Sequence, residues 1–203
     1  MAERAHPEDP GFQDKCFGLV RNKYKKKMYE RYRFCHPYIR DKVLLDIPCG
    51  VGWGTSLLKG YKSMTGMDIA PDAINYANSH YANSRLHFLA GNMKAIPVED
   101  NSFDNIICLE GFEHISKEIG RTFLTEVKRV LRRNGLLIMT CPVLSEKGET
   151  TGNPYHLSEY SEEEFIDLMN HNFRIEQLNR FQGPDGIEYK IVVENFKEQR
   201  YLK

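Results

Sequence analysis

The sequence lacks several features that would place the chain in a specialised class of proteins. Its 203 residues contain no apolar run near the roughly 18 residues of a membrane span, and Met1–Pro10 is too polar for a secretory signal. An excess of either charge is also missing, because 28 basic residues balance 28 acidic ones. We therefore expect no membrane partner, and binding to nucleic acid is not favoured.

Cysteine is also scarce and shows no spacing that carries chemistry. The five cysteines make an odd number, and no two of them form a C-x-x-C pair. A disulfide framework and a cysteine-based zinc site are therefore not expected. Cys108 and Cys141 fall within apolar runs, where a reduced cysteine acts as a small hydrophobic side chain. These features predict a reducing compartment, and we expect the protein in the cytoplasm.

What the sequence does contain is an alternation of short apolar runs and segments with helical spacing. The runs that predict strands are Val43–Ile47, Tyr61–Met67, Arg85–Leu89, Asn105–Leu109 and Leu136–Thr140. Between the fourth and fifth of these, Ile119, Phe123 and Val127 repeat at helical spacing. This order predicts a single doubly wound, Rossmann-like α/β domain with a mostly parallel sheet.

The last part of the chain predicts two more strands, which bring the sheet to seven. Phe173–Phe181 and Ile187–Asn195 are separated only by a short turn, so they should pair antiparallel and give the sheet an antiparallel edge strand. Ahead of them, Ser161–Glu164 has the pattern of a helix capping box. Two further boundaries are predicted from turn residues, a helix cap at Asn134-Gly135 and a turn over Asn101–Asp104.

A glycine-rich loop follows the first predicted strand and carries the clearest functional signal. It reads Asp46-Ile-Pro-Cys-Gly50-Val-Gly52-Trp-Gly54. Glycine lets the backbone approach a ligand closely, and the helix N-terminus behind the loop favours a ligand's negative end. This spacing differs from the G-x-G-x-x-G of nicotinamide and flavin sites, so a nicotinamide enzyme is a weaker alternative. Asp68, at the end of the second strand, can accept both ribose hydroxyls of a nucleoside.

An ordered series of motifs resembles the class I S-adenosylmethionine-dependent methyltransferases, in their small-molecule, type 11-like branch. The resemblance covers residues 43–173. The segments that carry it are Leu45–Gly54, Gly66–Ala70, Gly91–Pro97, Asn101–Ile107, Glu110–Ile115 and Glu126–Gly135. It implies that S-adenosylmethionine is the cofactor and that residues 41–203 form the methyltransferase domain. Residues 1–40 are then expected to form a helical extension on the acceptor side.

The resemblance also implies a role for each matching position in holding the cofactor. Asp46 would orient the loop and the methionine amino group, while Gly50 and Gly52 would line the methionine and the ribose. Asp68 would hold the ribose hydroxyls. The remaining contacts are expected from Ile69, Asn92 and Met93 around the adenine, and from Leu109 and Glu110 beneath the methionine.

Two of the cofactor positions depart from the family pattern. Pro48 stands where the family usually has glycine, and proline fixes φ and removes a backbone donor from the loop. Asn92 stands where the family usually has aspartate; its side-chain carbonyl can still accept from the adenine amine, but without charge. We expect both changes to weaken cofactor binding without abolishing it.

Two histidines are candidates for catalytic groups. His114 follows the fourth predicted strand, where the acceptor should meet the methyl group, and His156 follows the fifth. A positioned base that takes the proton of an acceptor hydroxyl contributes about 10²–10⁴-fold to the rate. The alternative for His114 is a structural imidazole bonded to a backbone carbonyl. A sharper option is a metal site, because Glu110, Glu113, His114 and His156 resemble the divalent-metal set of small-RNA terminal 2′-O-methyltransferases.

The leading hypothesis for function is methyl transfer from S-adenosylmethionine to an oxygen or nitrogen of a small-molecule acceptor. The segment Asn153–His156 resembles methyltransferases found among glycan-building enzymes, so a sugar-linked acceptor is one candidate. A non-catalytic S-adenosylmethionine-binding module or partner subunit is the alternative. Metal-assisted RNA 2′-O-methylation is a lesser one, since the chain lacks a basic excess for RNA. Nothing in the sequence indicates the oligomeric state.

Overall fold

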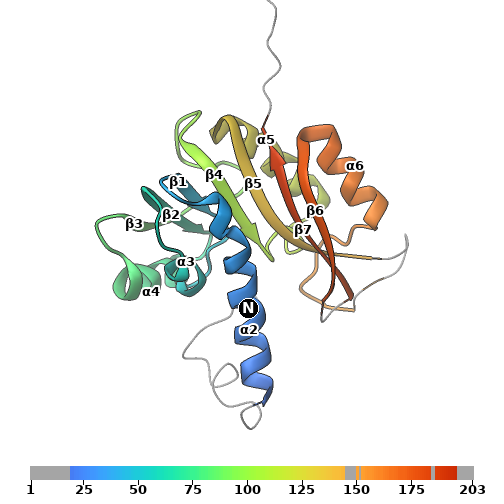
Figure 1. The fold of residues 1–203 in the computed structure, drawn as a ribbon, viewed down its shortest axis with the longest axis horizontal. Coiled ribbons are helices and arrows are strands. Elements are labelled where there is room, and N and C mark those ends of the chain that lie inside the picture. Colours follow the sequence, from blue (N-terminus) through green and yellow to red (C-terminus); the bar gives the residue numbers. More distant parts are fainter. Residues whose placement is uncertain (1–18, 145–149, 151, 184–185, 196–203) are drawn as a thin grey trace, which may run out of the picture.

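One seven-stranded sheet organises the part of the protein that the computed structural model describes, residues 19–144, 150, 152–183 and 186–195. The strands lie in the order β3-β2-β1-β4-β5-β7-β6 (Figure 1). Five of them pair in parallel, and their bounds are β1 Val43–Asp46, β2 Ser63–Asp68, β3 Leu86–Ala90, β4 Phe103–Leu109 and β5 Leu131–Val143. The predicted Rossmann-like, doubly wound fold is confirmed.

The last two strands form the antiparallel pair that their short connection predicts. Strand β7 (Gly186–Glu194) pairs antiparallel with β5 on one side and with β6 (Arg174–Gly183) on the other. The strand that opposes the others is therefore β7, which lies one place in from the edge, and β6 forms the edge itself. The centre of the predicted turn, residues 184–185, lies outside the described residues. This arrangement places β7 between β5 and the edge strand β6.

Helices cover both faces of the sheet. On one face, α2 (Leu19–Cys35) and α4 (Pro71–Tyr81) pack into a core that contains Leu44 and Ile107 of the central strands. The short helix α3 (Trp53–Leu57) contacts both α2 and α4. On the opposite face, α5 (Lys117–Val130) and α6 (Glu162–Asn172) share a second core with the other side of the same strands. The alternation of side chains along each buried strand supplies both cores.

Local sequence explains where the helices α5 and α6 begin. The side chain of Ser116 accepts a hydrogen bond from the backbone N–H of Ile119 at the start of α5. At the start of α6, Ser161 accepts from the backbone N–H of Glu164, whose carboxylate accepts in return from the backbone N–H of Ser161. The predicted capping box is therefore confirmed, and both caps satisfy donors that the first helical turn leaves open.

Two predicted boundaries are wrong because turn-forming residues serve a strand instead. Helix α5 ends at Val130, so Asn134-Gly135 is not its cap but lies inside β5, where Asn134 has a φ of 61°. A Cβ added to Gly135 would lie 2.5 Å from the backbone oxygen of Asp104, so glycine permits the close approach of β5 to β4. Phe103 and Asp104, predicted as part of a turn, already belong to β4. The pairing of these two strands is irregular between Phe103 and Asn105.

The N-terminal helix is an integral part of one core. A helical extension is expected over residues 1–40; α2 covers residues 19–35, the 3-10 helix η1 (His36–Tyr38) follows it, and residues 1–18 lie outside the described part. Tyr32, Cys35 and Ile39 are almost fully buried against the sheet. The division of the chain at residue 40 stays a prediction. None of the described helices is long and apolar enough to cross a membrane.

We expect truncation of Phe165 to weaken the whole fold. Its ring is fully buried and stacks on Tyr189 of β7 with 6.0 Å between ring centroids, so it joins α6 to the sheet. Phe165→Ala should lower the free energy of unfolding by about 3–5 kcal/mol, measured by urea denaturation. The matched control is Asp167→Ala on the exposed side of α6, expected within about 0.5 kcal/mol of wild type. Equal stability of the two variants would contradict this packing.

Candidate functional site

A cavity of about 470 Å³ opens at the carboxyl ends of β1, β2 and β4, where open α/β sheets bind their ligands. Most of the predicted cofactor positions line it, namely Pro48, Gly50, Asp68, Ile69, Asn92, Met93, Leu109 and Glu110. His114 and His156, the predicted catalytic groups, line the same cavity. Asp46 and Gly52 are not among its lining residues. The topology thus brings segments that are far apart in the sequence to one hollow.

The three glycines of the loop after β1 serve three different purposes. Gly50 has a φ of +54°, and a Cβ added to it would meet nothing within 4 Å, so its backbone faces open space. At Gly52, an added Cβ would lie 2.7 Å from the ring of Phe88. At Gly54, it would lie 2.0 Å from the ring of Tyr32 in α2. Gly50 therefore leaves room for a ligand, while the other two make room for the protein's own side chains.

Asp68 fixes the glycine-rich loop to the end of β2. One carboxylate oxygen accepts from the backbone N–H of Gly50 at 2.9 Å, and the other accepts from that of Ala70 at 3.0 Å. Each oxygen keeps a second lone pair, so the carboxylate can still accept from ribose hydroxyls. Next to it, the side chain of Ile69 is 66% exposed and lines the cavity, which gives a planar base an apolar surface. These features fit the expected nucleoside.

The two departures from the family pattern have local structural partners. Pro48 packs against Gly111, where an added Cβ would lie 2.2 Å from the proline Cδ. The side-chain oxygen of Asn92 accepts from the backbone N–H of Lys94 at 2.9 Å and keeps one lone pair for an amine. Met93 is 8% exposed and belongs to the core beneath the cavity. The loop is thus compatible with Pro48 because glycine stands opposite it.

Asp46 is completely buried and points toward α2 and α3. One of its oxygens accepts from the hydroxyls of Tyr32, at 3.1 Å, and Thr55, at 2.6 Å. The other oxygen is buried and has no hydrogen-bond partner among the residues that the structure describes. Burial raises the pKa of Asp46 to about 7, although the two hydroxyl donors oppose the shift. The structure therefore places Asp46 behind the cavity, where it holds the loop and the N-terminal helix together.

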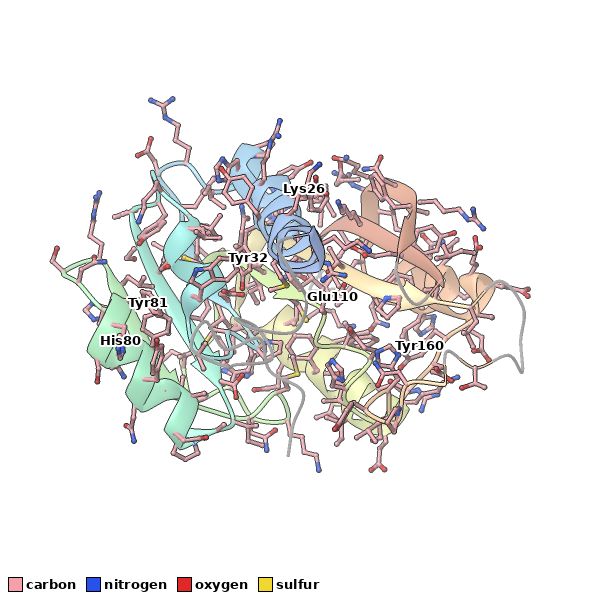
Figure 2. The ribbon with its side chains drawn as sticks, turned by 90° about the horizontal axis from the view of Figure 1, so that it is seen from below. Lys26, Tyr32, His80, Tyr81, Glu110 and Tyr160 are labelled. Atoms are coloured by element: carbon pink, nitrogen blue, oxygen red, sulfur yellow. The ribbon has the colours of Figure 1, made fainter. Side chains whose placement is uncertain are left out.

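A buried arginine that the sequence did not single out ties α2 to the cavity. The Nη2 atom of Arg31 lies 2.6 Å from one carboxylate oxygen of Glu110, at the end of β4. Its guanidinium also donates to both oxygens of Glu188 in β7, at 3.2 and 3.0 Å. Glu110 has a φ of 51° and receives a further hydrogen bond from the hydroxyl of Thr140. In Figure 2, the labelled side chains of Tyr32, which belongs to α2, and Glu110 lie close to this helix. No motif contains Arg31 or Glu188, so no sequence signal could have identified them.

His114 is held by a backbone carbonyl and still presents a lone pair to the cavity. Its Nδ1 atom lies 2.9 Å from the carbonyl oxygen of Tyr155, which can only accept, so Nδ1 carries the proton. The second ring nitrogen, Nε2, is then unprotonated in the neutral side chain. The structural bond that was the alternative to a catalytic role therefore also prepares His114 to accept a proton.

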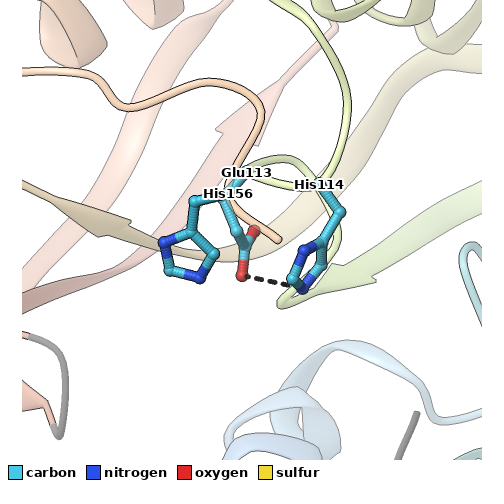
Figure 3. Close-up of side chains that lie close together, drawn as sticks. All are labelled: Glu113, His114 and His156. Carbon is cyan, nitrogen blue, oxygen red and sulfur yellow. Dashed lines mark ion pairs between the residues drawn. The ribbon is translucent and has the colours of Figure 1, made fainter. Parts of the chain in front are cut away.

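Glu113 lies between the two histidines, and all three side chains point to the same space (Figure 3). One ligand atom from each of Glu113, His114 and His156 lies within 4.8 Å of the others. Glu113 is 1% exposed, and burial, followed by the charge of Glu110, raises its pKa well above the usual value. Glu110 does not join this group, because Arg31 and Thr140 hold it elsewhere. Three of the four residues predicted as a metal set are thus brought together.

The raised pKa of Asp46 predicts a pH-dependent stability. A carboxyl whose folded pKa exceeds its unfolded value contributes stability below the unfolded pKa, near 4, and loses it as the pH rises through about 7. Asp46→Asn removes this titration. The free energy of unfolding of the variant should therefore improve relative to wild type by on the order of 3–4 kcal/mol between pH 4 and pH 8.

Urea denaturation of the cofactor-free protein across this pH range measures the effect. Asp167→Asn, which changes an exposed carboxyl on α6, is the matched control and should run parallel to wild type. A constant difference between Asp46→Asn and wild type at every pH would rule out the shifted pKa.

Comparison with known proteins supports the family that the motifs indicate. A family model described as a methyltransferase domain matches residues 45–139. A probable S-adenosylmethionine-dependent methyltransferase of Mycobacterium tuberculosis is 25% identical over 154 residues, which are 74% of this chain and 55% of that protein. A fatty-acid O-methyltransferase of Mycolicibacterium smegmatis is 30% identical over 122 residues, which are 59% of this chain and 43% of that protein. The chain thus spans about half the length of these curated relatives.

A solved structure shows the same fold with a product of the cofactor bound. The N-methyltransferase NodS of Bradyrhizobium japonicum, in complex with S-adenosyl-L-homocysteine, superposes with a TM-score of 0.69 at 17% identity. The match covers 94% of this chain and 91% of NodS. Motifs, fold and relatives agree, and together they support a class I S-adenosylmethionine-dependent methyltransferase domain in this chain.

Proposed function

We propose that the protein transfers a methyl group from S-adenosylmethionine to an oxygen or nitrogen of a small-molecule acceptor. The observation that carries this proposal is a single cavity with two chemically different ends. One end has the open backbone of Gly50, the carboxylate of Asp68 and the exposed Ile69. The other end has His114 and His156. A donor and an acceptor bound at these ends would meet inside one hollow shielded by α2.

The proposed place of the cofactor follows from hydrogen-bonding capacity. The ribose hydroxyls would donate to Asp68, and the adenine would lie on Ile69 with its amine toward Asn92. Leu109 and Glu110, at the end of β4, would lie beneath the methionine. The cofactor would supply the reactive methyl group. The chain would hold the two reactants in position and keep water out of the cavity. Alignment of this kind is worth roughly 7–11 kcal/mol in comparable reactions.

The proposed transfer needs a group that removes a proton from the acceptor. An acceptor oxygen would attack the methyl carbon as the carbon–sulfur bond breaks, so the sulfonium becomes a neutral thioether. The hydroxyl proton would pass to Nε2 of His114, whose other nitrogen is bonded to the Tyr155 carbonyl. His156 lies beside it, with 5.4 Å between the ring centroids, and would contact an acceptor bound at the same end of the cavity.

The name of one relative supports a class of acceptor. The relative from Mycolicibacterium smegmatis is named a fatty-acid O-methyltransferase, which favours a small molecule with an oxygen acceptor. A sugar-linked acceptor and a nitrogen acceptor stay predictions. Location in the cytoplasm also stays a prediction, and it agrees with the buried, unpaired thiols of Cys35, Cys49, Cys108 and Cys141.

Asp68 provides a test of the cofactor end. Asp68→Asn removes the charge that holds the ribose, and we expect the affinity for S-adenosylhomocysteine to fall about 10–100-fold in calorimetric titrations. Asp72→Asn, in the exposed first turn of α4, is the matched control and should bind as wild type does. Binding of NAD without binding of S-adenosylhomocysteine would overturn the cofactor assignment.

His114 provides a test of the acceptor end. His114→Ala should lower the rate of S-adenosylhomocysteine formation by about 10²–10⁴-fold while the affinity for the cofactor stays near normal. The control is His87→Ala, an exposed imidazole on β3. An unchanged rate in His114→Ala would exclude a catalytic role.

Turnover also separates an enzyme from the alternative of a non-catalytic binding module or partner subunit. Wild-type protein that binds S-adenosylhomocysteine but never forms it from S-adenosylmethionine, across fatty acids, sugars and amines, would favour the binding module.

A further inference from the structure

The facing atoms of Glu113, His114 and His156 include a carboxyl group and two imidazole nitrogens that carry no proton. Nδ1 of His114 donates to the Tyr155 carbonyl, so Nε2 carries a lone pair. Nε2 of His156 lies 3.1 Å from the side-chain amide nitrogen of Asn153, which donates to it, so this Nε2 is unprotonated and a cation would take the place of the Asn153 contact. The carboxylate of Glu113 lies between the two rings (Figure 3).

The contacts within the cluster are too long to be hydrogen bonds. Nε2 of His114 is 3.9 Å from the nearer oxygen of Glu113, beyond the range of a hydrogen bond. The other oxygen of Glu113 is buried and has no hydrogen-bond partner within the described part of the chain. A buried polar atom without a partner costs about 1–3 kcal/mol, more when it is charged. These atoms face one another in a way that favours a cation between them.

From this geometry we infer that Glu113, His114 and His156 form a binding site for one divalent transition-metal ion. Two imidazoles and one carboxylate, with a position left open, are a donor set that suits ions from Mn²⁺ to Zn²⁺. Donors that each lie about 2.0–2.2 Å from an ion are within roughly 4.4 Å of one another. In a tetrahedral site the donors lie about 3.4 Å apart, so the observed limit of 4.8 Å requires the side chains to move together by about 1 Å or more.

The backbone around the cluster holds the three residues in place. The carbonyl oxygen of Glu113 accepts from the backbone N–H groups of Leu157 and Ser158, at 2.8 and 3.1 Å, so the two loops that carry the ligands are joined directly. The Tyr155 carbonyl orients His114, and Glu159 lies 4.0 Å from Nδ1 of His156. Metal-binding histidines usually have such a carbonyl or carboxylate behind them, because it fixes the ring and its tautomer.

The charges around the cavity also favour a cation at this position. Burial raises the pKa of Glu113, and the charges of Glu110 and Glu188 add to this effect, while a backbone hydrogen bond and the charge of Arg31 oppose it. Arg31 itself pairs with Glu110 and Glu188. Glu110 remains with Arg31, so the site has three protein ligands, and its open position faces the cavity.

A bound ion would also affect the acceptor. This effect rests on the proposed methyl transfer, but binding of the ion does not. A bound divalent ion makes a hydroxyl or carboxyl oxygen more acidic and orients it. The acceptor class would then be an oxygen compound that can bind a metal. In the metal-bound protein Nε2 of His114 would hold the ion, so the proton-accepting role proposed above would apply to the metal-free protein alone, and the acceptor proton would pass to water.

Titration of the chelator-stripped protein with Co²⁺ tests the site without any turnover. We expect visible absorption bands that saturate at one ion per chain, and a higher Tm with Co²⁺ or Zn²⁺ but not with Mg²⁺. Glu113→Gln and His156→Ala should each weaken Co²⁺ binding by at least about 100-fold, since loss of even an outer partner can cost that much. His87→Ala, an exposed imidazole on β3, should bind Co²⁺ as wild type does.

The Tm of Glu113→Gln gives a second test, and this variant is expected to fold. Without metal it should raise the Tm, because a buried carboxylate oxygen without a partner is replaced by a neutral amide. With metal, its Tm should no longer rise. Absence of Co²⁺ bands in wild type, or binding that survives Glu113→Gln, would overturn the metal site.

Parallel titrations with S-adenosylhomocysteine separate this inference from the proposed function. If the cofactor binds and turns over while Co²⁺ does not bind, only the metal site fails. If Co²⁺ binds while S-adenosylhomocysteine does not, only the proposed methyl transfer fails.

Discussion

The buried guanidinium of Arg31 links three parts of the fold that meet at the cavity: α2, the end of β4 and the strand β7. It forms a fork with both oxygens of Glu188 and approaches one oxygen of Glu110. Loss of one partner from such a buried group leaves an uncompensated charge, which typically costs about 3–5 kcal/mol. Together with the bond from Tyr32 to Asp46, this contact decides where α2 lies and therefore how the cavity is covered.

The contact of Arg31 with Glu110 and Glu188 also affects the balance of charge at the cavity. Glu110 and Glu188 share a single arginine, while Glu113 and Asp46 are buried and have raised pKa values. Asp68, Glu110 and Glu113 line the cavity together with one guanidinium, that of Arg31. A lining with more carboxyl groups than cations suits ligands that bring positive charge, and the sulfonium of S-adenosylmethionine is one. The balanced charge of the whole sequence therefore conceals a locally acidic interior.

The sequence predicted the sheet and the loop after β1 because these depend on neighbouring residues, which set strand length and turn geometry. It could not predict which side chains approach them from elsewhere. Gly54 looked like part of a ligand cradle, yet the ring of Tyr32 occupies the space beside it. Asn134-Gly135 looked like a helix cap, yet the pair lies in β5 next to Asp104 of β4. Arg31 and Glu188 belong to no motif, so only the tertiary structure brings them to the site.

Arg31 and Glu188 are 157 positions apart, although they share one hydrogen-bonded fork. Contacts between such distant residues form late, because the loop they close carries a large entropic cost. Every motif from Leu45 to Gly135 is synthesised before β7, so a chain that stops short of this strand would carry all the family's signatures. It would nevertheless lack the partner that holds α2 over the cavity. The site is therefore complete only after β7 has joined the sheet, although all the motifs are already present in the shorter chain.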